Sequence, residues 1–189
     1  MLPKRRLAVG KREVSKVFIF LVFLSFLITA GCGTTKHYAR FEDNIYLKHY
    51  KSIEVYPCEN VANVNPGFDV TELITQNIIT LLQEKGFYVV NTPGENDLAL
   101  KTKLLEYKRG NAFKRWLLPG WGSTVCSVEA ELFDQTTGEL LGKINSRRTI
   151  SFGGAYSIGA WQTILKSVAK DIVNEIEKKI KQEELPRQQ

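Results

Sequence analysis

The stretch Asp69–Val90, with the sequence DVTELITQNIITLLQEKGFYVV, contains the clearest local folding signals of the chain. Asp69 can cap the first turn of a helix, and Glu72, three residues on, can reach back to the N–H of the cap. Apolar side chains then recur with the spacing of one helix face. Gly86 supplies the left-handed residue that ends a helix, and Phe87–Val90 follows as a short strand. The stretch therefore predicts a helix followed at once by a strand.

The flanking segments extend this unit into one domain. Lys51–Tyr56 alternates apolar and polar residues, so it predicts a strand that lies parallel to 87–90 after a right-handed crossover. The same alternation predicts strands over 98–104, 124–132 and 140–152, with Gly138 in the turn before the last one. A helix with a single apolar stripe follows over 158–180. We expect an α/β (α+β-like) fold in the order β-α-β-β-β-β-α, with a mixed sheet of about five strands and two helices packed on one face. The other face carries Lys101, Lys103, Glu129, Glu131, Lys143 and Arg147 and is expected to face solvent.

The N-terminal segment has the layout of a secretory signal. Six basic residues in 1–16 precede an apolar run from Val17 to Ala30, which ends on small residues immediately before Cys32. This run is shorter than the roughly 20 residues that span a bilayer. The alternative is an uncleaved N-terminal membrane helix with an incidental cysteine.

A cysteine at the cleavage position resembles the lipobox of bacterial lipoproteins. The resemblance implies that the Cys32 thiol becomes a lipid thioether and that its freed amine is acylated, commonly with palmitate. Gly33 implies sorting to the periplasmic face of the outer membrane, because Asp at that position is the inner-membrane signal. We therefore expect a signal peptide at 1–31, the lipidated cysteine and a tether at 32–50, one domain at 51–182 and a polar tail at 183–189. Four aromatic residues in 33–50 suggest that part of the tether packs on the domain.

The charge distribution argues against nucleic-acid binding. The formal net charge is +6, but residues 1–16 hold six basic residues and one acidic residue. The other 173 residues carry 20 basic and 19 acidic groups, which leaves no basic binding face.

The sequence offers few groups for chemistry. His37 and His49 both lie in or beside the predicted tether, so we expect no metal site and no cofactor. Neither a Gly-x-Ser-x-Gly elbow nor a phosphate-binding loop is present, and we expect that the protein is not an enzyme. Cys58 and Cys126 are candidates for a disulfide in an oxidising compartment. Two buried thiols are the alternative.

The best candidate site is the segment 108–122. It combines cations with aromatic side chains: Lys108, Arg109, Phe113, Lys114, Arg115, Trp116 and Trp121. In one interpretation the apolar side chains cover a sheet edge and the cations are solvated. In the other, aromatics and cations together contact lipid headgroups or a partner protein.

Residues 107–124 and the hairpin sequence Phe133–Glu139 resemble the bacterial lipoproteins grouped as domain-of-unknown-function family 4410. The shared features are a glycine–basic–glycine loop, a strand, an Asp-x-x-Thr-Gly hairpin and a final helix, over roughly residues 50–182. We expect a membrane-anchored envelope lipoprotein with a non-catalytic domain that serves protein interaction or assembly, with another envelope protein as partner. The alternative is a periplasmic lipoprotein that binds a small ligand or lipid in a deep apolar pocket between sheet and helices.

Overall fold

The computed structural model describes residues 34–90, 97–118, 120–151 and 158–184. The predicted signal peptide 1–31, the lipidation site Cys32 and the tail residues 185–189 lie outside these ranges.

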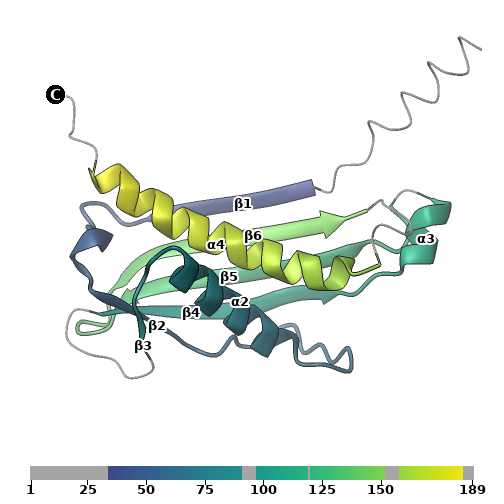
Figure 1. The fold of residues 1–189 in the computed structure, drawn as a ribbon, viewed down its shortest axis with the longest axis horizontal. Helices are drawn as coiled ribbons and strands as arrows, with labels where there is room; N and C mark the ends of the chain where they lie inside the picture. The colour runs from purple at the N-terminus through teal and green to yellow at the C-terminus, as the bar shows by residue number, and fades with distance from the viewer. Residues whose placement is uncertain (1–33, 91–96, 119, 152–157, 185–189) are drawn as a thin grey trace, which may run out of the picture. The chain divides into compact units, whose positions relative to one another are not determined.

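The domain is built on one six-stranded mixed sheet with the strand order β1-β6-β5-β4-β2-β3. The strands are β1 (Thr34–Phe41), β2 (Ser52–Val55), β3 (Val89–Val90), β4 (Asp97–Lys108), β5 (Thr124–Asp134) and β6 (Leu140–Ile150). The helices are η1 (Leu47–His49), α2 (Val70–Glu84), α3 (Ala112–Leu117) and α4 (Ala160–Glu184). β2 is parallel to β3 and β4, and the remaining pairs are antiparallel. The predicted class and the parallel β2–β3 pair are confirmed (Figure 1), while β1, η1 and α3 were not predicted.

The ends of α2 follow from its sequence. The Asp69 carboxylate accepts a hydrogen bond from the N–H of Glu72 at 2.9 Å, which satisfies a first-turn amide. After the helix, Gly86 has φ +84°, and the N–H of Phe87 donates to the carbonyl of Leu82 at 3.0 Å. Gly86 adopts this left-handed conformation without a Cβ penalty, so the chain turns directly into β3.

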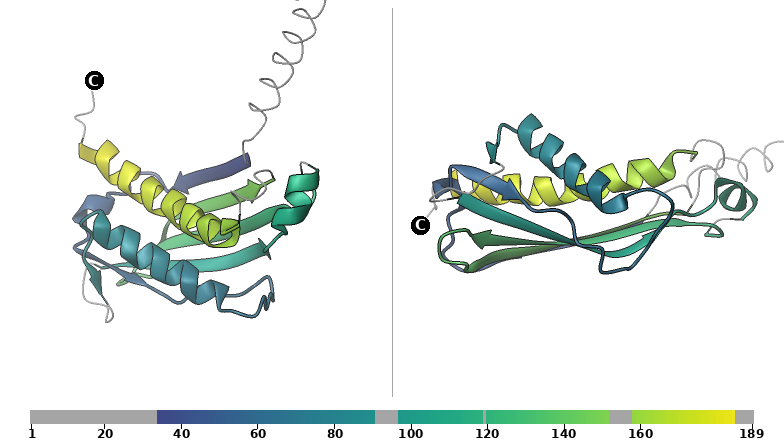
Figure 2. Two further views of the ribbon diagram at one scale, coloured as in Figure 1. Left: turned by 45° about the vertical axis from the view of Figure 1, so that its right-hand side comes forward. Right: turned by 90° about the horizontal axis from the view of Figure 1, so that it is seen from below.

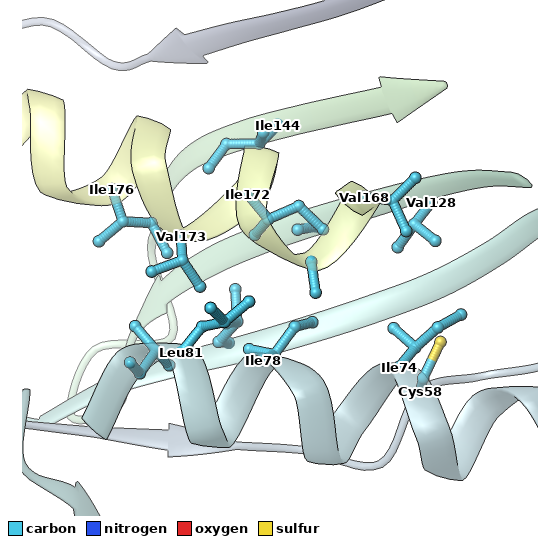
Figure 3. Packing of buried hydrophobic residues seen from close by; sticks show 14 of the residues in the cluster. Cys58, Ile74, Ile78, Leu81, Val128, Ile144, Val168, Ile172, Val173 and Ile176 are labelled. Atoms are coloured by element: carbon cyan, nitrogen blue, oxygen red, sulfur yellow. The ribbon is translucent and has the colours of Figure 1, made fainter. Parts of the chain in front are cut away.

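The core lies between the sheet and the two long helices, which pack on the same face (Figure 2). Ile74 and Ile78 of α2 and Ile172 of α4 are fully buried, and they belong to one apolar cluster with Val128 and Ile144 from the sheet (Figure 3). Both helices are apolar along one stripe only, so packing them on one face leaves their polar stripes in water.

Charges form a network on the opposite face of the sheet. The Glu131 carboxylate lies 2.9 Å from the Lys103 ammonium and 3.0 Å from that of Lys143, and Lys143 also lies 3.1 Å from Glu129. Lysines and glutamates alternate across β4, β5 and β6, so each carboxylate has a cation on a neighbouring strand. These hydrogen bonds hold the pKa of Glu131 below its usual range, against a smaller opposing effect of burial.

An ion pair with a buried carboxylate joins α4 to β6. The Asp171 carboxylate accepts from Nε and Nη2 of Arg148 at 2.7 and 2.6 Å and from the Ser146 hydroxyl at 2.7 Å. Burial alone raises the pKa of Asp171. The hydrogen bonds from Arg148 and Ser146 outweigh it, so the pKa lies below its ordinary value.

The predicted tether is largely part of the domain. All eight residues of β1 pair with β6, and Phe41 packs so closely on Gly142 that a Cβ there would lie 2.5 Å from Cδ1 of Phe41. The Glu183 carboxylate accepts from the N–H groups of Leu47 and Lys48 at 3.1 and 3.0 Å. These contacts place the described domain at 34–184 instead of 51–182, because the segment before β2 and the last turn of α4 stabilise each other.

Candidate contact surface at the α3 end of the sheet

The segment between β4 and β5 contains a short helix, where the sequence predicted only a loop. Asn111 caps α3 by accepting a hydrogen bond from the N–H of Lys114 at 3.1 Å. Gly122 has φ +77°, and its carbonyl accepts from the N–H of Asn111 at 2.8 Å. A Cβ on Gly122 would lie 2.6 Å from Cβ of Lys114 and 2.8 Å from the Asn111 carbonyl oxygen. Glycine therefore allows the chain leaving α3 to pass against its first turn.

Arg115 holds α3 on the sheet. Its side chain is 2% exposed, and Nη1 donates to the carbonyl of Gly122 and to the Thr124 hydroxyl, both at 2.8 Å. The Thr124 hydroxyl in turn donates to the carbonyl of Arg109 at 2.8 Å. Burial lowers the pKa of Arg115. The prediction that Arg115 contacts a partner or membrane is wrong, because its guanidinium satisfies carbonyl and hydroxyl groups inside the turn.

The apolar side chains of this segment point outward. Phe113 and Trp116 are 65% and 66% exposed, and their rings lie 6.0 Å apart. We call the exposed set the α3 patch: Phe113, Trp116, Leu117, Leu118 and Trp121. This exposure argues against the interpretation that these side chains cover a sheet edge.

Cations border the α3 patch. Lys108, Arg109 and Lys114 are exposed, and the ammonium of Lys114 lies 5.4 Å from the centre of the Trp121 ring. The Arg109 guanidinium lies 5.4 Å from the Trp161 ring, which fixes it beside the start of α4. From 107 to 128 the sequence contains no acidic residue. The α3 patch is therefore apolar and lies in a segment whose charged side chains are all cations.

The start of β1 lies at the same end of the sheet as α3 (Figures 1 and 2). The register shows this residue by residue: Thr34 pairs with Thr149, Thr149 with Val125, and Val125 with Lys108. The N–H of Gly120 also donates to the carbonyl of Ser151 at 3.0 Å, just beyond the end of β6. The sequence does not reveal this neighbourhood, because β1 lacks the apolar alternation of a half-buried strand.

Cys58 and Cys126 are both buried and both free thiols in the structure. Burial raises the pKa of Cys126 to about 12 and also raises that of Cys58. Both thiols are therefore protonated near neutral pH, and neither is poised as a nucleophile.

The described surface has a groove between α2 and α4. Its volume is about 530 Å³, and it is lined by Leu73, Asn77, Gln162, Thr163, Leu165, Lys166, Ser167 and Lys170. Across the ranges that the structure describes, no three His, Cys, Asp or Glu side chains gather where they could hold a metal ion. None of the helices in these ranges combines the length and apolarity needed to cross a membrane.

Comparisons with known proteins relate the chain to one family model and to several solved structures. The model described as Domain of unknown function (DUF4410) matches residues 61–154. No curated protein sequence matches the chain at a significant level. The PelC dodecamer from Paraburkholderia phytofirmans has a similar fold, with a TM-score of 0.55, 14% identity and coverage of 74% of this chain and 96% of that one. Protein XCC0632 from Xanthomonas campestris, of the family DUF330, gives a TM-score of 0.50, 12% identity and coverage of 71% and 88%.

Proposed function

The chain belongs to the DUF4410 family, and on that footing we propose that it is an exported bacterial lipoprotein anchored in the cell envelope through Cys32. Its α/β domain acts by contact with another envelope component, in an interaction or assembly role, without catalysis. The signal layout before Cys32 supports the anchor, and Gly33 after it favours the periplasmic face of the outer membrane.

The exposed α3 patch is the observation that carries the contact function. Soluble monomers seldom expose clustered large apolar side chains, and such clusters mark binding surfaces. Trp, with Tyr and Arg, is the residue type most enriched where binding energy concentrates, and the patch contains Trp116 and Trp121. Because Arg115 fixes the backbone beneath them, binding through these rings does not require the turn itself to become ordered.

The fold is compatible with an assembly role. PelC from Paraburkholderia phytofirmans, which has a similar fold, forms a dodecamer. The alternative function, binding of a small ligand or lipid, would need an apolar cavity between sheet and helices. Fully buried side chains such as Ile78, Leu100 and Ile172 occupy that layer in the described domain, so no observation favours this alternative.

Photo-crosslinking in cells tests the proposal. A photoreactive amino acid replaces Trp116 in the α3 patch or, as a matched control, Tyr88 beside β3, since the two side chains are 66% and 71% exposed. We expect adducts with an envelope component at position 116, few at position 88, and loss of both the adducts and palmitate labelling in Cys32→Ser. Equal adducts at the two positions, or none at 116, would contradict the contact function. Unchanged palmitate labelling in Cys32→Ser would contradict the anchor.

A further inference from the structure

We infer that the component contacted by the α3 patch is the lipid surface of the membrane that holds Cys32. The inference rests on the proposed function, because it requires the anchor. It specifies which component the α3 patch contacts, and it predicts which end of the domain faces the bilayer.

The position of the anchor is the first argument. Cys32 precedes Thr34 by two residues, so its Cα lies within about 7 Å of the first Cα of β1. Thr34 shares one row across the sheet with Thr149, Val125 and Lys108. At about 4.8 Å per strand, this row spans roughly 15 Å from the anchor side to the strand that leads into α3. An acyl chain on Cys32 therefore brings the bilayer surface to the end of the sheet that carries the patch.

The chemistry of the patch is the second argument. Trp side chains favour the boundary between headgroups and hydrocarbon, since an indole ring is apolar but carries one N–H donor. Lys114 beside the Trp121 ring and the exposed Lys108 at the end of β4 suit the anionic headgroups of bacterial phospholipids. No carboxylate in residues 107–128 opposes that attraction. An aromatic and cationic surface next to a lipid attachment point fits a lipid surface better than a partner protein that would have to displace the bilayer.

This arrangement fixes the orientation of the domain. β5 runs away from the patch for 11 residues, so its far end lies roughly 33 Å along the strand from the end that carries the patch. Tyr88 lies near that far end, because β3 pairs with β2 beside the start of β4 and Leu98 of β4 pairs with Asp134 at the end of β5. A side chain at position 88 therefore reports on a distant location in the same molecule.

Quenching of tryptophan fluorescence by brominated lipids tests the inference on the acylated full-length chain. The protein is reconstituted into phosphatidylethanolamine–phosphatidylglycerol vesicles with or without bromine on the acyl chains. The variant Trp161→Phe leaves only Trp116 and Trp121 as emitters. The matched reporter combines Trp116→Phe, Trp121→Phe and Trp161→Phe with Tyr88→Trp, which leaves one exposed emitter at the far end.

We expect brominated vesicles to remove most emission from Trp161→Phe and little from the Tyr88→Trp reporter. Equal quenching in both proteins, or none in Trp161→Phe while it stays with the vesicles, would overturn the inference. An adduct of position 116 with a protein instead of a lipid in cells would also overturn it. Failure of the proposed anchor is recognised separately, because the chain would then lack acyl label and would not remain with the vesicles.

Discussion

Replacing Asp171 by Asn removes the charge of a buried carboxylate and keeps its shape. The Asp171 side chain is 7% exposed and accepts three hydrogen bonds, two of them from the Arg148 guanidinium. Removing one partner of a buried ion pair costs about 3–5 kcal/mol. Arg148 is 32% exposed and can turn toward water, so we expect the free energy of unfolding to fall by about 2–3 kcal/mol. In a domain of this size that corresponds to a Tm about 5–10 °C lower.

Urea denaturation followed by circular dichroism measures this loss. Glu177→Gln makes the same carboxylate-to-amide change on the same helix. There Lys181 and Lys85 lie 2.6 and 2.7 Å from the carboxylate and both lysines are solvent-accessible, so the change should cost no more than about 1 kcal/mol. The double variant Arg148→Met/Asp171→Leu removes both charges and should be more stable than Asp171→Asn. A value for Asp171→Asn within about 0.5 kcal/mol of the unmodified protein would refute the reasoning, because the loss would then match that of a surface pair.

Three further predictions use the same purified chain. The folded-state pKa of Asp171 is lowered, so the stabilisation by its carboxylate is complete above the unfolded pKa of about 3.9 and is lost as pH falls through the folded pKa. The difference in unfolding free energy between the unmodified protein and Asp171→Asn should therefore shrink as the pH is lowered. A difference that stays constant with pH would contradict this. Gly138→Ala should lower the free energy of unfolding by about 1 kcal/mol, because residue 138 has φ +72° but no atom near the new Cβ. Gly122→Ala should lower it clearly more, because the new Cβ would also clash with Lys114 and Asn111. Equal unfolding midpoints for the two variants would argue against the close passage at Gly122. Cys58 and Cys126 should react with a thiol reagent only after unfolding, and a chain that stays unreactive when unfolded without reductant would instead contain the disulfide.

The parts of the fold that the sequence predicted are those whose signals are local. Asp69, Gly86 and the alternating residues of β4 and β5 each determine their own conformation, so α2, the turn after it and the two long strands could be recognised directly. The pairing of β1 is different. Its first five side chains are exposed, so it lacks the apolar alternation that identifies a half-buried strand.

The candidate surface was predicted in composition but not in arrangement. The aromatic and basic residues in 108–122 indicated a contact surface. In the sequence Arg115 cannot be distinguished from the neighbouring exposed cations, but in the structure it is buried under the turn. Its burial depends on Gly110 and Gly122, which bring the chain close around the guanidinium; a Cβ on Gly110 would lie 2.7 Å from Nη1 of Arg115. Such an arrangement depends on contacts between the two ends of the segment, which spacing in the sequence does not reveal.

The early start of β1 has a consequence for how an acylated chain would meet its partners. Gly33 alone separates Cys32 from the sheet, so the linker between the attachment point and the domain is about 7 Å long. An extended 33–50 segment would instead reach roughly 60 Å. The volume through which the attachment point can move scales with the cube of that length and is smaller by a factor of about 600. Encounter with a partner then becomes a two-dimensional search governed by lateral diffusion of the lipid, and a partner from elsewhere in the envelope has to come to the membrane surface.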